Sequence, residues 1–259
     1  KMQPNVIVLI IDSLRYDHCG CYGAEKSYTP NLDAFARECA VFENAYPEAL
    51  PTIPIRTSLM TGQRTLSYRP WQPLTKEDVT VAELLDELGY TSAFITDNYH
   101  QFKPGFNFHR GFHVFRWVRG QEADAYESAP HPWNIDDFIK PEMRGDWVVK
   151  MIEQYLRNRA DWQTEEDWFT PRLVKESIRW LERNNRNQPF MLWFDCFDPH
   201  EPWDPPGPYK SKYTDPGYRG PDLIHPKYGP VDWLTDEELN YIRGLYAGEV
   251  EFVDKWIGF

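Results

Sequence analysis

The stretch Asn5–Ile11, which reads NVIVLII, decides the fold of this chain. It is a continuous apolar run, too short for a core helix and rich in β-branched residues. Such a run is typical of a strand that is buried on both faces of a parallel sheet. We therefore expect Val6–Ile11 to form an inner strand of a parallel sheet.

Segments with strand-like and helix-like patterns alternate along the rest of the sequence. Further strands are predicted at Tyr90–Thr96 and Pro189–Cys196. Helices are predicted at Thr29–Cys39, at Val79–Leu88 with Gly89 after its end, at Pro171–Asn184 and at Thr235–Ile257. Two long excursions over the strand ends are expected at Gln101–Trp147 and Trp203–Trp233. The alternation predicts an α/β fold, with a mostly parallel central sheet and helices on both faces.

Composition excludes several classes of protein. The 259 residues are 41% hydrophobic, which is enough for one large domain or two small ones. A net charge of −12 argues against a nucleic-acid-binding surface, because a phosphate backbone attracts basic patches. No stretch approaches the ~20 apolar residues of a membrane span. Since no signal peptide is visible, we expect a cytoplasmic protein without a membrane partner. We expect the four cysteines to be ordinary thiols.

Asp12 is the first residue that could take part in chemistry. It follows directly on the first predicted strand. The carboxyl ends of parallel strands meet at the crevice where α/β enzymes bind their ligands, so a carboxylate there is a candidate site residue. A solvated turn residue or a cap of the next element explains Asp12 equally well when it is taken alone.

The segment Leu50–Gly62 (LPTIPIRTSLMTG) is the second candidate. Thr52 is predicted to be the N-cap of a helix that Gly62 ends, and most threonines at such positions are only caps. However, Pro54 has no N–H to hold the Thr52 hydroxyl, and a helix N-terminus stabilises negative charge. Arg56 lies one turn later on the same helical face, and its planar fork suits phosphate or sulfate oxygens.

The ends of the other two predicted strands carry the remaining candidates. Asn98 and His100 follow the strand that ends at Thr96, and His200 lies between prolines after the strand that ends at Cys196. His200 could bind an anionic ester or protonate a leaving group. Ordinary turn and surface-loop residues are the alternative. The convergence of all these side chains on strand ends favours an active site over the separate structural explanations.

The order of these motifs resembles that of the sulfatase family of the alkaline phosphatase superfamily. Thr52–Gly62 (TIPIRTSLMTG) resembles the family's C/S-x-P-x-R-x-x-x-x-T-G signature. Ile10–Gly23 is similar to its opening strand and loop, Leu84–His100 to the segment with its Lys-x-His pair, Asp198–Pro206 (DPHEPWDPP) to its PH-x-P loop, and Tyr246–Gly258 to the helix before its last metal motif. The resemblance implies an alkaline-phosphatase-like fold. It also implies that residues 1–259 are the N-terminal part of a single catalytic domain, incomplete at its C-terminal end.

The resemblance also implies a role for each candidate residue. Asp12 and Thr52 would be ligands of a divalent metal ion, which could be calcium, manganese, zinc or magnesium. Thr52 would also be the nucleophile, and Arg56 would hold both the nucleophile and the transferred group. The other contacts with the substrate would come from the catalytic His200 and from Asn98 and His100.

The sequence departs from the family pattern at four places. Ser13 replaces the second of two adjacent aspartates, and Asn98 replaces a common lysine. Thr52 replaces cysteine or serine, so the aldehyde nucleophile of sulfatases cannot form. The chain also stops at Phe259, before the Asp-Asn or Asp-His-Gly motif that supplies further metal ligands.

These features together predict a metal-dependent hydrolase that acts on small-molecule sulfate or phosphate esters. A threonine alkoxide suits phosphoryl transfer through a covalent phospho-enzyme, whereas the overall pattern is closer to sulfatases, so the choice between the two esters stays open. The alternatives are a non-catalytic binding protein with the sulfatase fold and a phospho-alcohol transferase. Because two protein ligands seldom hold a divalent ion, we expect these 259 residues alone to be inactive.

Overall fold

The computed structural model describes residues 3–25, 28–66 and 68–259. Contacts within the chain divide it into two compact units. The first, which we call the sheet unit, comprises residues 1–12, 42–118 and 173–196. The second, the helical unit, comprises residues 13–41, 119–172 and 197–259. Each unit is therefore assembled from three separate segments of the chain.

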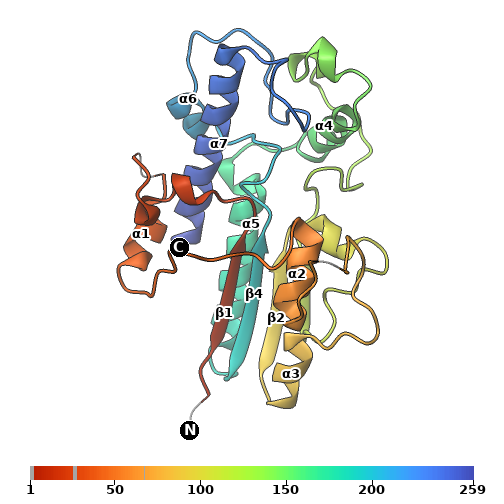
Figure 1. Ribbon diagram of the computed structural model, residues 1–259, viewed down its shortest axis with the longest axis vertical. Helices are drawn as coiled ribbons and strands as arrows, with labels where there is room; N and C mark the ends of the chain where they lie inside the picture. Colours follow the sequence, from red (N-terminus) through yellow and green to blue (C-terminus); the bar gives the residue numbers. More distant parts are fainter. Residues whose placement is uncertain (1–2, 26–27, 67) are drawn as a thin grey trace. The chain divides into compact units, whose positions relative to one another are not determined.

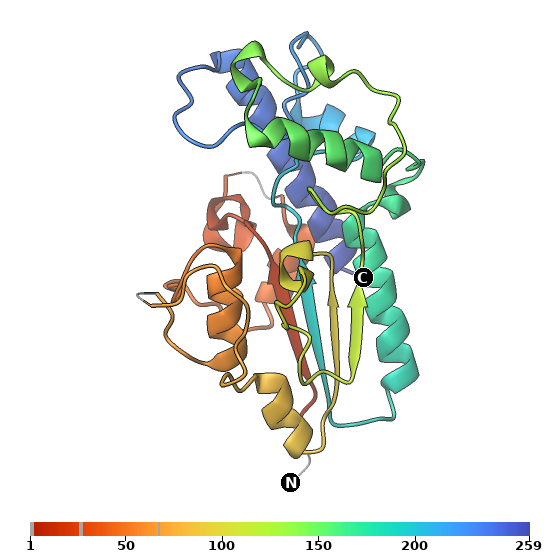
Figure 2. The ribbon, with the colours of Figure 1, turned by 90° about the vertical axis from the view of Figure 1, so that its right-hand side faces the viewer.

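The sheet unit contains a four-stranded sheet. Its strands are β1 (Val6–Ile11), β2 (Thr91–Thr96), β3 (Val114–Trp117) and β4 (Phe190–Cys196), in the order β1-β4-β2-β3. All three strand pairs are parallel. Helices α2 (Thr52–Thr61) and α3 (Val81–Glu87) lie on one face, and α5 (Phe169–Asn184) lies on the other (Figures 1 and 2). The predicted α/β class, with a parallel sheet covered on both faces, is confirmed.

The predicted place of the first strand is wrong. Within the described residues β1 is at the edge of the sheet, whereas β4 and β2 are the inner strands. Ile7 and Leu9 are 50% and 48% exposed, while every residue of β4 is buried. A run in which every residue is apolar carries no period, so the sequence could not show that one face of β1 is exposed.

The core of the sheet unit lies between α2 and the sheet. Ile53 and Met60 of α2 pack in one cluster with Phe94 of β2 and Trp193 of β4. Ile53 and Phe94 are fully buried. Each such side chain contributes about 1.5–3 kcal/mol through the apolar surface that it removes from water. This packing fixes α2, and therefore the residues at its first turn, against the sheet.

The helices predicted at Val79–Leu88 and Thr235–Ile257 are present, and in the structure each begins at a capping box. Thr80 caps α3, and its hydroxyl and the Glu83 carboxylate form a reciprocal capping box. Thr235 and Glu238 form the same arrangement at the start of α7 (Asp236–Ile257). These contacts satisfy backbone N–H groups that have no partner inside a helix. Gly89 follows α3 with a φ of +82°, a conformation that glycine adopts without the steric cost of a Cβ.

The helical unit is organised around α7. Its other helices are α1 (Pro30–Ala36), α4 (Trp147–Asn158) and α6 (Gly207–Tyr213). The backbone N–H groups of Asn31 and Leu32, in the first turn of α1, each donate to the Asp254 carboxylate of α7 at 2.9 Å. Gly244 lets α6 approach α7 closely, because a Cβ there would lie 2.4 Å from the Tyr213 carbonyl oxygen. Short 3-10 turns complete the fold at Tyr16–His18, Gly20–Tyr22, Ile135–Asp137, Pro141–Met143 and Glu165–Asp167, and in the sheet unit at Tyr99–Phe102.

The two predicted excursions contain regular structure that the sequence analysis missed. The strand β3 and the start of α4 lie within Gln101–Trp147, and α6 lies within Trp203–Trp233. Both α6 and β3 are short, seven and four residues, so their periodicity is weak. Helix α1 is also shorter than predicted, since it ends at Ala36 instead of Cys39.

Two predictions concern the chain as a whole. The four cysteines are free thiols, as expected. Among the residues that the structure describes, none of the helices combines the length and the apolarity that a bilayer span requires.

Candidate active site

The centre of the candidate site is a group of three charged side chains in the sheet unit, of which Arg56 and Asp195 are buried. Asp12 directly follows β1, and its N–H donates to the Cys196 carbonyl of β4 at 2.9 Å. Asp195 is the penultimate residue of β4. Arg56 of α2 meets both carboxylates: its Nη1 lies 2.7 Å from Asp12 Oδ2, and its Nη2 lies 2.7 Å from Asp195 Oδ1. The predicted proximity of Asp12 and Arg56 is therefore confirmed by the geometry.

The pair of Arg56 and Asp195 is a two-point contact. Arg56 Nε donates to Asp195 Oδ2 at 3.0 Å, in addition to the bond from Nη2. Arg56 is 3% exposed and Asp195 is fully buried. Burial by itself would lower the pKa of the Arg56 guanidinium, but the two carboxylates outweigh it and raise that pKa above its ordinary value. Arg56 therefore stays charged inside the protein.

The three charges do not cancel. One guanidinium and two carboxylates carry a formal charge of +1 − 2 = −1. A net charge in a buried position is costly unless a counter-charge balances it. A cation is compatible with this formal charge, and the oxygen atoms of Asp12 are donors of the kind that hard divalent ions prefer. The charge and the donor chemistry of this group fit the divalent metal that the sequence predicts.

Thr52 begins α2, one turn before Arg56. The structure corrects its predicted place as an N-cap: Pro51 occupies the cap position, and no side chain caps this helix end. Thr52 is 7% exposed, and its hydroxyl has no hydrogen-bond partner within the described part of the chain. The reason is that α2 starts one residue earlier than the cap assignment assumes, so Thr52 already has helical geometry. Its hydroxyl is therefore not used as a cap.

Asn98 and His100 lie after β2, as predicted. Asn98 is fully buried, and its Oδ1 accepts the His100 N–H at 3.2 Å, which is the ordinary role of an asparagine at a turn. Its Nδ2 is buried without a hydrogen-bond partner among the described residues. The His100 ring packs edge-on against Trp71, with 5.0 Å between centroids. The Asn98 amide thus has N–H groups that no described residue accepts, while the His100 ring is held by Trp71.

Gln101 and Asp195 belong to the site although the sequence analysis gave them no role. Gln101 is fully buried, and its Nε2 donates to Asp195 Oδ2 at 2.9 Å. A signal for Asp195 existed, because an aspartate within an otherwise apolar strand needs a buried partner. Nothing in the local sequence singled out Gln101, which was placed at the start of an irregular excursion.

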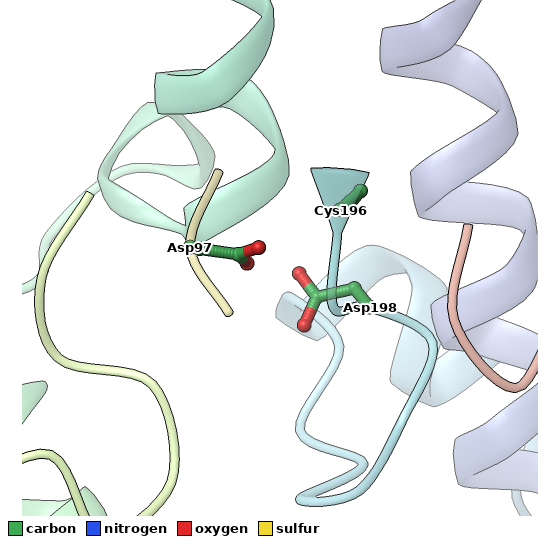
Figure 3. Close-up of side chains that lie close together, drawn as sticks. All are labelled: Asp97, Cys196 and Asp198. Atoms are coloured by element: carbon green, nitrogen blue, oxygen red, sulfur yellow. The ribbon is translucent and has the colours of Figure 1, made fainter. Parts of the chain in front are cut away.

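The carboxyl end of the sheet carries further ligand-type side chains. Asp97 follows β2 and Cys196 ends β4, and their potential ligand atoms lie within 4.8 Å of each other. Both side chains are fully buried. Asp198, two residues after Cys196, is the first carboxylate of the helical unit that follows β4 (Figure 3). None of these three residues was predicted from the sequence to have a function.

His200 belongs to the helical unit. Its ring stacks on Phe197, with centroids 4.1 Å apart, and its Nδ1 lies 2.9 Å from the Glu201 carbonyl oxygen. The Glu201 and Glu122 carboxylates lie 3.5 Å and 3.7 Å from the same nitrogen. One ring nitrogen of His200 thus lies close to two carboxylates and a carbonyl oxygen.

Asp198 is held within the helical unit by neutral donors. It accepts hydrogen bonds from Thr170 Oγ1 at 2.9 Å and from Gln121 Nε2 at 2.8 Å. Burial raises the pKa of Asp198 to about 6, although these hydrogen bonds oppose the shift. Asp198 is consequently a buried carboxyl group whose proton is held more tightly than that of an exposed aspartate.

The candidate residues are divided between the two units. The sheet unit brings Asp12 and Arg56 into direct contact, with Thr52 on the same helix and Asn98 and His100 after the neighbouring inner strand. His200 is held separately by the helical unit. A hydroxyl without a partner, a buried guanidinium and an excess of negative charge are features of a site for a metal ion and an oxyanion.

Comparisons with known proteins give an independent view of these features. The sulfatase family model matches residues 4–258. The arylsulfatase of Clostridium perfringens (strain 13 / Type A) is 29% identical, over 99% of this chain and 58% of that protein. Human N-acetylgalactosamine-6-sulfatase is 25% identical, over 96% of this chain and 48% of that protein. The chain thus spans about half the length of these curated relatives.

A solved structure shows the same fold. The crystal structure of the phosphonate monoester hydrolase of Agrobacterium radiobacter aligns with a TM-score of 0.69 at 20% sequence identity. The alignment covers 99% of this chain and 58% of that one. The match to the family model extends over almost every residue, and its range includes Asp12, Thr52 and Arg56. This chain is a member of the sulfatase family, whose relatives belong to the alkaline phosphatase superfamily.

Proposed function

We propose that the protein containing this chain hydrolyses sulfate or phosphate esters, with the Thr52 hydroxyl as the attacking oxygen. The observation that carries this proposal is the buried contact of Arg56 with both Asp12 and Asp195, one helical turn from a hydroxyl without a partner among the described residues. A structural ion pair alone would need only one carboxylate. The second carboxylate leaves an excess negative charge, which is the electrostatic requirement of a metal site.

The position of Thr52 favours attack by its oxygen. It lies in the first turn of α2, where the backbone N–H groups and the helix dipole stabilise negative charge. The same N–H groups suit the oxygens of a bound sulfate or phosphate group. Because Pro54 has no N–H, the Thr52 hydroxyl meets no backbone donor there that would hold it as a cap.

Arg56 is positioned to bind the transferred group as well as to orient Asp12. A guanidinium has five N–H donors, and the contacts with Asp12 and Asp195 involve three of its nitrogen atoms, each once. The remaining N–H groups are available to sulfate or phosphate oxygens. The two-point contact with Asp195 fixes the plane of the guanidinium, so these donors keep one direction.

Asp12 and Thr52 would hold the divalent metal, together with ligands from other groups, since hard cations take six or more oxygens. Bound there, such an ion would lower the pKa of the Thr52 hydroxyl and neutralise charge on the transferred group. The protein's own contribution is to keep Asp12 oriented through Arg56 and through its N–H bond to Cys196.

The remaining candidates bind the substrate and protonate the leaving alcohol. The buried Nδ2 of Asn98 is a donor for an ester oxygen, and His100 would contact the anionic group. His200, with Glu122 and Glu201 beside it, would give its proton to the departing oxygen. Protonation matters most for alkyl and sugar alcohols, because their alkoxides are poor leaving groups.

Two kinds of ester suit this site. Threonine cannot form the aldehyde of sulfatases, and an alkoxide attack suits phosphoryl transfer. A relative from Trinickia caryophylli, 27% identical over 99% of this chain, is named a multifunctional alkaline phosphatase superfamily protein, whereas other relatives are named sulfatases. We therefore propose activity on sulfate esters, on phosphate esters or on both.

The test compares Thr52→Ala, Thr52→Ser and a matched control in the full-length protein. Thr57→Ala removes a hydroxyl that bonds the Ile53 carbonyl in the same helix, so it controls for loss of a buried threonine. We expect Thr52→Ala to abolish turnover of 4-nitrophenyl phosphate and sulfate, and Thr52→Ser to retain part of it. Wild-type turnover in Thr52→Ala, or no hydrolysis by the wild type with any divalent ion, would refute the proposal and favour a binding protein.

A further inference from the structure

The helical unit contains a pocket that the catalytic residues above do not occupy. Its volume is about 580 Å³, within the usual range for small-molecule sites. The side chains that matter for its chemistry are Arg15, His18, Tyr28, Trp203, Arg243 and Tyr246. They come from the loop after Asp12, from the loop after β4 and from α7, which all belong to the helical unit.

Aromatic rings in mutual contact form the wall of this pocket. His18 stacks on Tyr28 with centroids 5.3 Å apart, and it meets Tyr246 edge-on at 4.9 Å. Trp203 also meets Tyr246 edge-on, with 5.7 Å between the ring centroids. Rings that hold one another in this way are fixed before a ligand arrives, which lowers the entropic cost of binding.

The polar ends of two of these rings are already satisfied by the protein. Tyr246 Oη donates to the Ser13 carbonyl at 2.8 Å and accepts the Arg15 N–H at 2.9 Å. Trp203 Nε1 donates to the Pro199 carbonyl at 3.0 Å. The ring surfaces that face the pocket are therefore available for apolar contact with another ring.

The pocket also carries positive charge. Arg15 and Arg243 line it, and the lining side chains within the described residues include no carboxylate. Asp17, outside the lining, neutralises Arg15 by accepting from its Nε at 2.9 Å. Arg243 is exposed on α7, where its Nη1 lies 3.4 Å from the amide oxygen of Asn240, which is a neutral partner. This is a local exception in a chain with a net charge of −12.

The pocket shares a loop with a candidate catalytic residue. Trp203 lies three residues after His200, and its indole bonds the carbonyl of Pro199, the residue before His200. A ring against Trp203 would thus rest on the same loop that carries the proposed proton donor. The alcohol part of an ester is the part that His200 would protonate, so it is the part expected on this loop.

We infer that this pocket binds a ring of the substrate's alcohol part, and that the ring carries a second negative charge recognised by Arg243. This inference rests on the proposed function, since it assigns the alcohol part of that ester. An anionic aryl ring and an anionic sugar share the required chemistry, namely a flat or apolar ring face and a negative group at its edge. Trp203 and Tyr246 take the ring, and Arg243 takes the charge.

The test measures binding of unreactive probes to the full-length protein by isothermal titration calorimetry. The probes are benzoate and glucuronate, with benzyl alcohol and methyl glucoside as their neutral counterparts. We expect an anionic probe to bind at least roughly tenfold more tightly than its neutral counterpart, the size of one charge-assisted hydrogen bond. The tighter of the two anionic probes identifies the class of ring.

Three variants separate the elements of the inference. Arg243→Ala should remove the preference for the anionic probe, whereas Arg144→Ala, which alters an exposed arginine outside the lining, should retain it. Trp203→Leu should weaken the binding of both the anionic probe and its neutral counterpart. Trp203→Phe should restore part of that affinity, and this recovery would show that the fold is intact. Equal binding of charged and neutral probes, or an unchanged preference in Arg243→Ala, would overturn the inference.

The result also remains separable from the catalytic proposal. Thr52→Ala should bind the probes like the wild type while losing turnover. If the wild type binds the anionic probe but hydrolyses no ester, the catalytic proposal fails and the pocket stands. If it hydrolyses esters but shows no preference for the anionic probes, the pocket assignment fails alone.

Discussion

Arg56 and Asp195 form a buried two-point ion pair, in which Nε and Nη2 donate to the two carboxylate oxygens at 3.0 Å and 2.7 Å. Asp195 lies within β4, and Arg56 lies in α2. The pair therefore joins the sheet to the helix that begins with Thr52. Through this contact, the position of Thr52 depends on a residue 143 positions later in the sequence (195 − 52).

Removal of Asp195 should destabilise the protein strongly. Asp195→Ala removes the acceptor of the buried Arg56 Nε and Nη2 and of the buried Gln101 Nε2, and each buried donor that is left without an acceptor costs about 1–3 kcal/mol. The free energy of unfolding from urea titrations measures the loss. Asp136→Ala, which breaks an exposed pair with Arg144, should cost roughly 0–1 kcal/mol. Similar losses in the two variants would contradict the structural role given to the buried pair.

The stability of the protein should also depend on the titration of Glu249. This α7 side chain is 2% exposed, and burial raises its pKa well above the ordinary value, with further contributions from Asp198 and Asp204. Above the ordinary glutamate pKa, the native state keeps a proton that the unfolded chain has lost. Stability is then greatest at and below that ordinary value and falls as pH rises toward the raised pKa.

Glu249→Gln should remove this pH dependence, because glutamine resembles the neutral acid. We expect the variant to be more stable than the wild type at pH 8 and about equal to it at pH 4, as measured by chemical unfolding at several pH values. Glu237→Gln, at an exposed position in the first turn of the same helix, controls for the change in net charge. A Glu249→Gln variant that loses stability at pH 8 would show that the buried carboxylate is ionised and paired.

The role of His200 predicts a dependence on the leaving group. If His200 gives its proton to the departing oxygen, His200→Asn in the full-length protein should lower kcat for alkyl esters by about 10²–10⁴-fold. The loss for 4-nitrophenyl esters should be much smaller, because nitrophenolate leaves without help. His109→Asn, at an exposed histidine, is the control and should change neither rate. Equal losses for both substrates would assign His200 a structural role instead.

The sequence predicts some features of the fold and leaves others open. The alternation of β-branched runs and amphipathic segments was sufficient to predict a parallel α/β sheet. The start of α3 was predicted two residues too early, at Val79, because the capping box of Thr80 and Glu83 was not recognised in the sequence. The edge position of β1 could not be predicted, because strand order depends on contacts between distant segments. Helix α4 was readable but missed: Val148, Met151, Ile152 and Tyr155 are buried at helical spacing.

In the candidate site too, some contacts could be predicted from the sequence and others could not. The proximity of Asp12 and Arg56 could be predicted from the sequence, because the ends of parallel strands and the helix after them share one edge of the sheet. The contact of Gln101 with Asp195 could not, since it joins a short 3-10 turn to a strand 94 positions later. The cap prediction for Thr52 was wrong for a local reason. A one-residue shift of the helix start moves a hydroxyl from the cap into the first turn.

The excess negative charge around Arg56 leads to a prediction about metal binding. In the full-length protein, magnesium, calcium, manganese or zinc should raise Tm, because an ion that binds only the folded state stabilises it. At one hundred times its Kd this amounts to about 2.7 kcal/mol, or a Tm increase of at least about 3 °C. A chelator should reverse the increase. Differential scanning calorimetry with each ion in turn provides the measurement.

The variant Asp12→Asn tests whether this ion binds where the charge excess lies. The substitution changes the formal charge of the Asp12–Arg56–Asp195 group from −1 to 0, and Arg56 keeps its two-point contact with Asp195. In the absence of metal, the variant should be about as stable as the wild type, because asparagine has the shape of aspartate and Arg56 stays paired with Asp195. The Tm increase with metal should disappear, and ester hydrolysis with it. Asp86→Asn, at an exposed carboxylate of the same unit, should keep both. If Asp12→Asn responds to the ions as the wild type does, the metal is held elsewhere, and the excess charge beside Arg56 is balanced in another way.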